Sequence, residues 1–283
     1  MDESTRAFLF SWEWRVTVWL PLLVFGILFT RGWLRLRRLP TQKGQPSVHL
    51  ATIWRLISYW LGLFLLALAL LSPIDSLGGQ LFTMHMVQHL LLGMYAPPLL
   101  LVTNPLPILM WGLPLGISRP IGRIVFSRSS KIRPYITAIT TPFFVWLLFL
   151  VVLWGWHDSA FYNLALRSER IHDLEHLSFF ISAMLLWWHI TGSGPRFHKR
   201  MSDTVRLIFT AGCLPVNMIL GIALALSDGV IYTYYETLPF RLWGLSVLAD
   251  QQMGGAIMWV FGSMMYVIAI LVLIGQGLQR EGR

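Results

Sequence analysis

The chain has 283 residues, of which 55% are hydrophobic and only 12% are charged. Because a soluble globular domain carries about 25% charged residues, this composition excludes a soluble protein and predicts a helical membrane protein. The formal net charge of +9 does not indicate nucleic-acid binding, since Lys and Arg concentrate in alternate loops, as they do in membrane proteins. The single cysteine, Cys213, excludes an internal disulfide and a cysteine-pair metal site.

Seven apolar segments are candidates to cross a bilayer, which takes roughly 20 residues per helix. The predicted fold is an all-α polytopic bundle of seven transmembrane helices in one domain, residues 1–283. The predicted spans are 14–30, 52–71, 81–102, 141–156, 172–191, 205–226 and 248–274. The first is expected to be a retained span, because acidic residues precede it where a signal peptide carries bases.

The loops alternate in charge along the chain. Those after the first, third and fifth predicted spans are rich in Lys and Arg, and those after the second, fourth and sixth carry few or none. This alternation predicts an N-terminus outside and a C-terminus in the cytoplasm. Pro97-Pro98 are expected to kink or end the regular hydrogen bonding of the third span, and Pro215 to interrupt the sixth. Residues 117–126 predict a short interfacial helix.

Five of the eight histidines fall at one predicted level, near the outer membrane surface. His85 and His89 open the third span, His157 closes the fourth, and His172 and His176 open the fifth. Residues four apart share a helix face, so both opening helices present a pair of imidazoles. Ionisable groups in membrane spans usually face the bundle interior and serve a function. The alternative is that these rings hydrogen-bond the backbone or each other at the water boundary.

The remaining histidines have simpler interpretations. His49 and His198 fall in basic loops predicted to be cytoplasmic, and are expected to be solvated. His189 lies at the inner end of the fifth span beside Trp187 and Trp188, as an interfacial histidine would. None of the three is expected to bind metal.

The five outer histidines predict a metal site, since imidazole suits copper, zinc and iron. Glu175 and Asp173 could orient an imidazole or be ligands themselves. Thioethers favour Cu(I), but methionines beside such rings are more often explained by packing. Asp250 could join the site or cap its own helix. The possible further ligands or orienting residues are Glu175, Asp173, Asp250, Gln251, Gln252, Met84, Met86 and, near the first pair, Met94.

Three motifs together resemble the CtaG family, the bacterial assembly factors associated with caa3-type cytochrome c oxidase. They are LFTMHMVQHLLLGMYAPPLLL, then WGWHDSAFYNLAL followed by IHDLEHLSFFISAMLLWW, and LWGLSVLADQQMGGAIMW. The likeness runs from about residue 74 to 266, in matching order. It implies a seven-span protein of the bacterial plasma membrane that aids oxidase maturation by delivering copper, with its metal site on the outer side.

The resemblance also carries over to individual positions. The family's histidine positions match His85, His89, His157, His172 and His176, and its acidic-glutamine motif matches Asp250, Gln251 and Gln252, with Gly254 and Gly255 allowing close helix approach. Family members place Pro one or two residues after the fourth-span histidine, whereas Asp158 and Ser159 follow it here. The implied partners are oxidase subunits and the lipid bilayer, with a periplasmic copper chaperone as a further candidate and no nucleic acid.

Other functions use the same residues. An intramembrane zinc hydrolase would hold Zn²⁺ on three histidines, with Glu175, Asp173 or Asp250 as general base. A haem protein would use two histidines as axial ligands, although two per helix exceeds what axial ligation needs. A purely structural interaction protein is also open, whereas a retinal photoreceptor is disfavoured because the seventh span has no Lys. The expected role is copper handling without catalysis.

Overall fold

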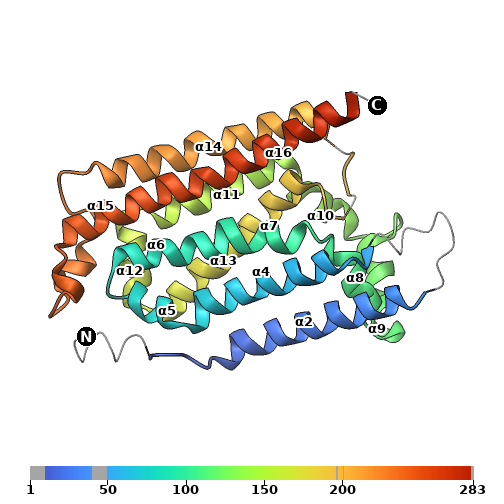
Figure 1. Ribbon diagram of the computed structural model, residues 1–283, viewed down its shortest axis with the longest axis horizontal. Helices are drawn as coiled ribbons and strands as arrows, with labels where there is room; N and C mark the ends of the chain where they lie inside the picture. Colours follow the sequence, from blue (N-terminus) through green and yellow to red (C-terminus); the bar gives the residue numbers. More distant parts are fainter. Residues whose placement is uncertain (1–9, 40–49, 196, 200, 282–283) are drawn as a thin grey trace.

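The computed structural model describes residues 10–39, 50–195, 197–199 and 201–281, and these form helices, turns and loops with no strand. His49, the acidic first residues and part of the basic loops lie outside the described residues. The long helical rods lie alongside one another (Figure 1). They are α2 (Val16–Arg37), α4 (Ile53–Leu71), the continuous α6 (Phe82–Leu90), η1 (Leu91–Tyr95) and α7 (Ala96–Leu101), α11 (Pro142–Trp156), α13 (Glu169–Thr191), α14 (Asp203–Ala225), and the continuous α15 (Val247–Ile257), η5 (Met258–Gly262) and α16 (Ser263–Glu281).

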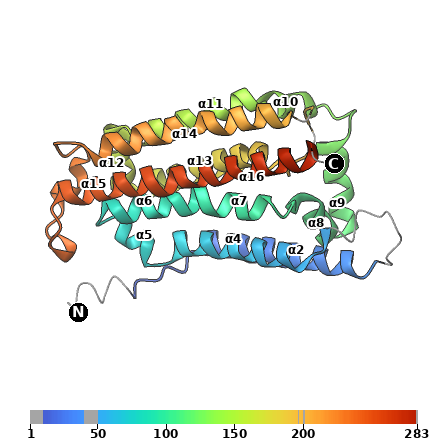
Figure 2. The same ribbon diagram turned by 45° about the horizontal axis from the view of Figure 1, so that its top comes forward.

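Short elements close the two ends of this bundle (Figures 1 and 2). At the end where the described chain begins lie α5 (Pro73–Gly78), α12 (Ser159–Arg167) and the 3₁₀ turns η3 (Thr233–Thr237) and η4 (Leu242–Gly244). At the other end lie α8 (Pro105–Gly112), α9 (Leu115–Ile121), η2 (Gly122–Phe126) and α10 (Arg133–Ile139). The predicted helix at 117–126 is therefore helical over its length, as α9 and η2.

Several of these rods are suited to a membrane. Four described helices are long and apolar enough to cross one, and up to six if each of two bent pairs counts as one span. The bends are 73° between Leu101 and Pro105, and 57° between Ile139 and Pro142. The rod α13 is not among the six, because the His and Glu side chains of its first half lower its hydropathy. The chain is thus a multi-pass helical membrane protein, and seven spans and their orientation stay predictions.

The predicted effect of proline is confirmed in the third rod and wrong in the sixth. The regular α-helical hydrogen bonding of the third rod gives way to the π-helical η1 just before Pro97 and Pro98, and the rod bends further on, near Asn104, which has a left-handed φ of 51°. Proline at 97 removes the bond to the carbonyl of residue 93, and Trp187 Nε1 donates to that Gly93 carbonyl at 2.9 Å. The π-helical turn η1 just before the prolines makes room for their rings. The sixth rod, α14, instead runs unbroken through Pro215.

Two hydrophobic clusters hold the rods together. The larger joins buried residues of α6, α11, α13, α14 and η5, and the smaller joins α2, α4, α7 and α8. Close backbone contacts need glycine between α14 and the last rod: a Cβ on Gly255 would lie 2.5 Å from the Ala225 amide nitrogen. Asn217 of α14 donates to the Met258 carbonyl at 3.1 Å, satisfying a backbone group at η5. Within this bundle, the histidines of α6 and of the first half of α13 lie close together.

Candidate metal centre

Four buried side chains from two helices form the centre of the site. His85 and His89 extend from α6, and Glu175 and His176 from α13. Each offers one ligand atom, and these four atoms all lie within 4.8 Å of one another. None of the four residues is more than 7% exposed. We call this set the buried site.

The donor atoms of the buried site have few partners of their own. Both ring nitrogens of His89 and of His176, and both carboxylate oxygens of Glu175, make no hydrogen bond to any described residue. Leaving a buried polar group without a hydrogen bond costs about 1–3 kcal/mol. A purely structural cluster that left all of these atoms unpaired would therefore be costly. Three imidazoles and a carboxylate suit a borderline metal ion such as copper or zinc. The residues present therefore fit a metal.

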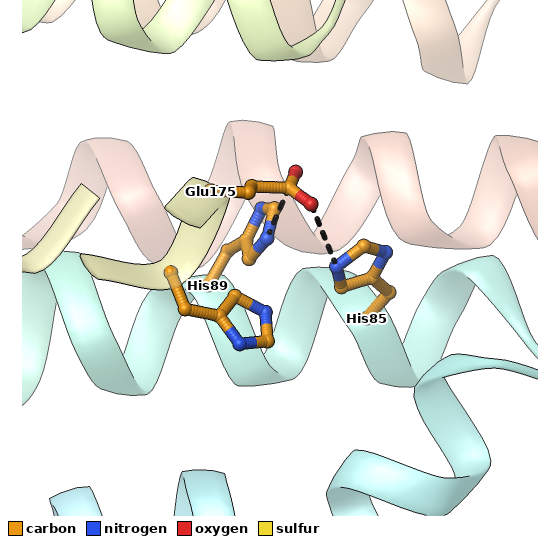
Figure 3. Close-up of side chains that lie close together, drawn as sticks. His85, His89 and Glu175 are labelled. Atoms are coloured by element: carbon orange, nitrogen blue, oxygen red, sulfur yellow. Dashed lines mark ion pairs between the residues drawn. The ribbon is translucent and has the colours of Figure 1, made fainter. Parts of the chain in front are cut away.

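Glu175 lies between the two imidazoles of α6. Figure 3 shows its carboxylate directed at both rings, with Oε1 3.4 Å from His89 Nε2 and Oε2 3.9 Å from His85 Nε2. The His85 and His89 ring centroids are 4.3 Å apart, as the i, i+4 spacing predicted. An ionised Glu175 would supply negative charge to balance a bound cation.

Two further histidines flank the buried site. His157 lies at the C-terminal end of α11, and the centroid of its ring is 5.9 Å from that of His89. The Nδ1 of His157 bonds the Leu153 carbonyl, and its Nε2 makes no hydrogen bond to a described residue. His172 is partly buried, and its Nε2 lies 3.3 Å from His85 Nε2. All five predicted histidines and Glu175 thus come together at one place, drawn from three helices.

A chain of tyrosines, which sequence reasoning missed, positions His85. The Tyr162 hydroxyl lies 2.5 Å from His85 Nδ1 and 3.0 Å from the Tyr235 hydroxyl. Tyr235 in turn donates to the Gly78 carbonyl at 2.9 Å, and burial raises the pKa of its hydroxyl. By holding Nδ1, this chain directs His85 Nε2 toward Glu175 and His172. Nothing in the sequence separated Tyr162 and Tyr235 from ordinary core tyrosines.

A second missed group lies at the partly exposed side of the site. Asp75 of α5 bonds Gln88 Nε2 at 2.5 Å and Arg15 Nη2 at 2.9 Å. Burial raises the pKa of Asp75, and the positive charge of Arg15 opposes the shift. Asp75, His172 and His176 form a second group whose donor atoms lie within 4.8 Å of one another. The sequence feature that could have pointed to Asp75 is that it is an acidic residue in the loop after the second predicted span, which contains no Lys or Arg.

The Asp250-Gln251-Gln252 motif supports the site from outside it. Asp250 accepts from the Phe82 and Thr83 amides at 2.8 and 3.0 Å, and so caps α6, the helix of His85. It also pairs with Arg241 at 3.0 Å. The cap of Asp250's own helix is instead Ser246. Gln251 bonds the Ile231 amide and the Gly229 carbonyl, and Gln252 bonds the Ser227 carbonyl. These bonds fix the loop that leads to Tyr235.

The other candidates have partners outside the buried site. Asp173 is exposed and pairs with Arg15 at 3.0 Å. Met86 and Met94 are buried in the larger core cluster, and Met84 packs with Leu77, Leu81 and Leu242. His189 is buried at the opposite part of α13, where its Nε2 bonds the Thr140 carbonyl at 2.9 Å. Cys213 is buried in the core.

Comparison with known proteins adds a family to this geometry. A family model described as cytochrome c oxidase caa3 assembly factor (Caa3_CtaG) matches residues 27–280. Uncharacterized proteins of Mycobacterium bovis and Mycobacterium tuberculosis are each 25% identical over 266 residues, which cover 92% of this chain and 38% of theirs. One of Mycobacterium leprae is 23% identical over 277 residues, covering 96% of this chain and 40% of its own. The chain thus spans about two fifths of the length of these relatives.

No solved structure matches the chain. The family model, in contrast, covers nearly all of it and contains every residue of the buried site together with His157 and His172. The chain belongs to the caa3 cytochrome c oxidase assembly factor family.

Proposed function

We propose that this protein binds copper at the buried site and delivers it to a cytochrome c oxidase during assembly. The observation that supports this most strongly is the set of buried imidazole nitrogens without hydrogen-bond partners beside Glu175. His85, His89, His176 and Glu175 would hold the ion, and His157 and His172 would exchange with them. Several near-equivalent donors allow an ion to be released by ligand exchange, which a delivery protein needs.

The distribution of charge supports an outer location for the site. The basic residues Arg119, Arg123 and Arg133 lie in or beside α9, η2 and α10, at the bundle end opposite α5 and α12. Because positive loops stay in the cytoplasm, the histidine end would face outward across a bacterial plasma membrane. Copper taken up there could come from a periplasmic chaperone and pass to an oxidase subunit.

A second candidate function is zinc-dependent hydrolysis. Its supporting observation is Glu175, placed beside three imidazoles where it could take a proton from a nucleophilic water, with the Tyr162 hydroxyl nearby. Zinc would supply Lewis acidity in such a site. Haem is less compatible, because four convergent donors exceed the two axial ligands that a bis-histidine haem iron takes.

The experiment that tests the proposal is metal analysis of the detergent-purified protein beside the double variant His85→Ala/His89→Ala. The wild type is expected to hold copper in a fixed ratio and the variant to lose it, with a matching fall in the copper content of the oxidase in cells. His198→Ala is the control, because His198 bonds Thr140 Oγ1 away from the site. Normal oxidase copper in the double variant would refute copper delivery, and tightly bound zinc with turnover would favour the hydrolase.

A further inference from the structure

The two groups of metal-donor side chains overlap. His176 belongs both to the buried site and to the group formed with Asp75 and His172. We propose that Asp75, His172 and His176 form a second, shallower metal site that receives the ion and passes it to the buried site. This inference rests on the proposed function, because it assigns the route by which the same ion arrives.

The shallow site is the more exposed of the two: His172 is partly buried, whereas the most exposed residue of the buried site, His89, is 7% exposed. The Asp173 side chain is 58% exposed, that of Arg15 is 18% and that of Asp75 is 9%, whereas His176 is 4% exposed and Glu175 is fully buried. The shallow site therefore lies between the surface and the buried site. His176, with both nitrogens free of hydrogen bonds to described residues, is the ligand that the two sites share.

The donors lie close enough for the ion to change ligands without leaving the protein. The His172 and His176 rings are 4.1 Å apart, and His172 Nε2 lies 3.3 Å from His85 Nε2. In the transfer, the bonds to Asp75 and His172 break as bonds to His85, His89 and Glu175 form, while His176 stays bound. The oxidation state of the ion does not change, and no oxidant or reductant is needed.

Arg15 competes with the ion for the shallow site. Its guanidinium bonds Asp75 Oδ2 at 2.9 Å and Asp173 Oδ1 at 3.0 Å, and it also contacts the Leu70 carbonyl and Glu13. Gln88 holds the other Asp75 oxygen. An ion binding to Asp75 must displace Arg15 from that carboxylate or share it, so Arg15 limits how readily the shallow site fills.

Uptake kinetics test this route. The full chain in detergent is mixed with Cu(I) alone, and both the rate of loading and the final occupancy are measured. Asp75→Asn is expected to slow loading about tenfold or more, the scale on which loss of a supporting ligand acts, while final occupancy stays that of the wild type. Arg15→Gln is expected to speed loading. Asp173→Asn is the control, since Asp173 also bonds Arg15 but is not a donor of either site.

The outcomes separate the two proposals. The shallow site would be overturned if Asp75→Asn loaded at the wild-type rate. It would also be overturned if Asp75→Asn and Asp173→Asn slowed loading equally, because that result would show only a general attraction of the ion by negative charge. Either result leaves copper binding at the buried site intact. Failure of the wild type to bind copper would instead refute the proposed function. If Asp75→Asn does not fold, Arg15→Gln tests the route instead. Loading of Arg15→Gln that is no faster than that of the wild type would overturn the route.

Discussion

At the scale of single residues, several polar atoms of the buried site have no hydrogen-bond partner among the described residues. Glu175 and His176 are adjacent on α13, both are buried, and none of their side-chain polar atoms bonds a described residue. If these positions served stability alone, apolar side chains would be more favourable there, because unpaired buried polar groups lower the stability of the fold. A bound cation would satisfy them all at once, so the burial and the chemistry point to the same use.

Glu175 should therefore contribute to metal affinity more than its neighbours in sequence. Glu175→Gln keeps the size of the side chain but removes the charge that faces His85 and His89. We expect copper affinity to fall by about 10–100-fold, measured by competition with a chelator. Glu169→Gln, an exposed residue on the same helix, should leave affinity unchanged. Equal affinity in both variants would show that Glu175 is not part of the site.

The sequence predicted the imidazoles of the site better than their supports. The i, i+4 spacing sets which rings share a helix face, so His85 with His89 and His172 with His176 could be paired from local geometry alone. Tyr162 and Asp75 could not, because they approach His85 and His172, respectively, from segments far apart in the chain. Asp250 was assigned to the correct end of the bundle, but its role as the cap of another helix depends on tertiary packing.

At the scale of elements, the position of α6 depends on Asp250. Asp250→Ala removes the acceptor for the Phe82 and Thr83 amides and leaves Arg241 without this partner. Loss of a cap costs about 0.5–2 kcal/mol, so we expect a lower unfolding midpoint while copper stoichiometry is kept. Asp228→Ala, on an exposed loop residue nearby in the chain, is the control. Lost copper at unchanged stability would instead identify Asp250 as a ligand.

Most rod boundaries could be predicted from apolar length, and the errors have physical causes. The first rod runs to Arg37 instead of residue 30, since Arg35 and Arg37 favour a helix C-terminus. The last runs to Glu281 instead of residue 274. The local preference of Pro215 wrongly predicts a break in α14, and at Pro97 the indole of Trp187 satisfies the carbonyl that the proline leaves unpaired. Local rules miss such compensation by another helix.

At the scale of the whole molecule, the bundle separates its two ends by chemistry. One end holds the five histidines of the metal centre, Tyr162, Tyr235 and the paired acids of α5 and α15, and the other holds the basic segment of α8 to α10 (Figure 1). The described chain begins at the first end and finishes at the second. An odd number of crossings follows if the bundle axis lies along the membrane normal, as the apolar rods suggest.

This arrangement predicts opposite accessibility of two loop positions. With the buried Cys213 replaced by Ala, single cysteines are introduced as Asp228→Cys at the histidine end and Ser129→Cys in the basic segment; both positions are exposed. A membrane-impermeant thiol reagent should label residue 228 in cells whose plasma membrane is intact, and residue 129 only after that membrane is opened, because the positive segment stays inside. The reverse pattern would place the metal centre on the cytoplasmic side and exclude delivery to an outer copper site. Labelling of both positions in intact cells would show that the two bundle ends do not lie on opposite sides of the membrane.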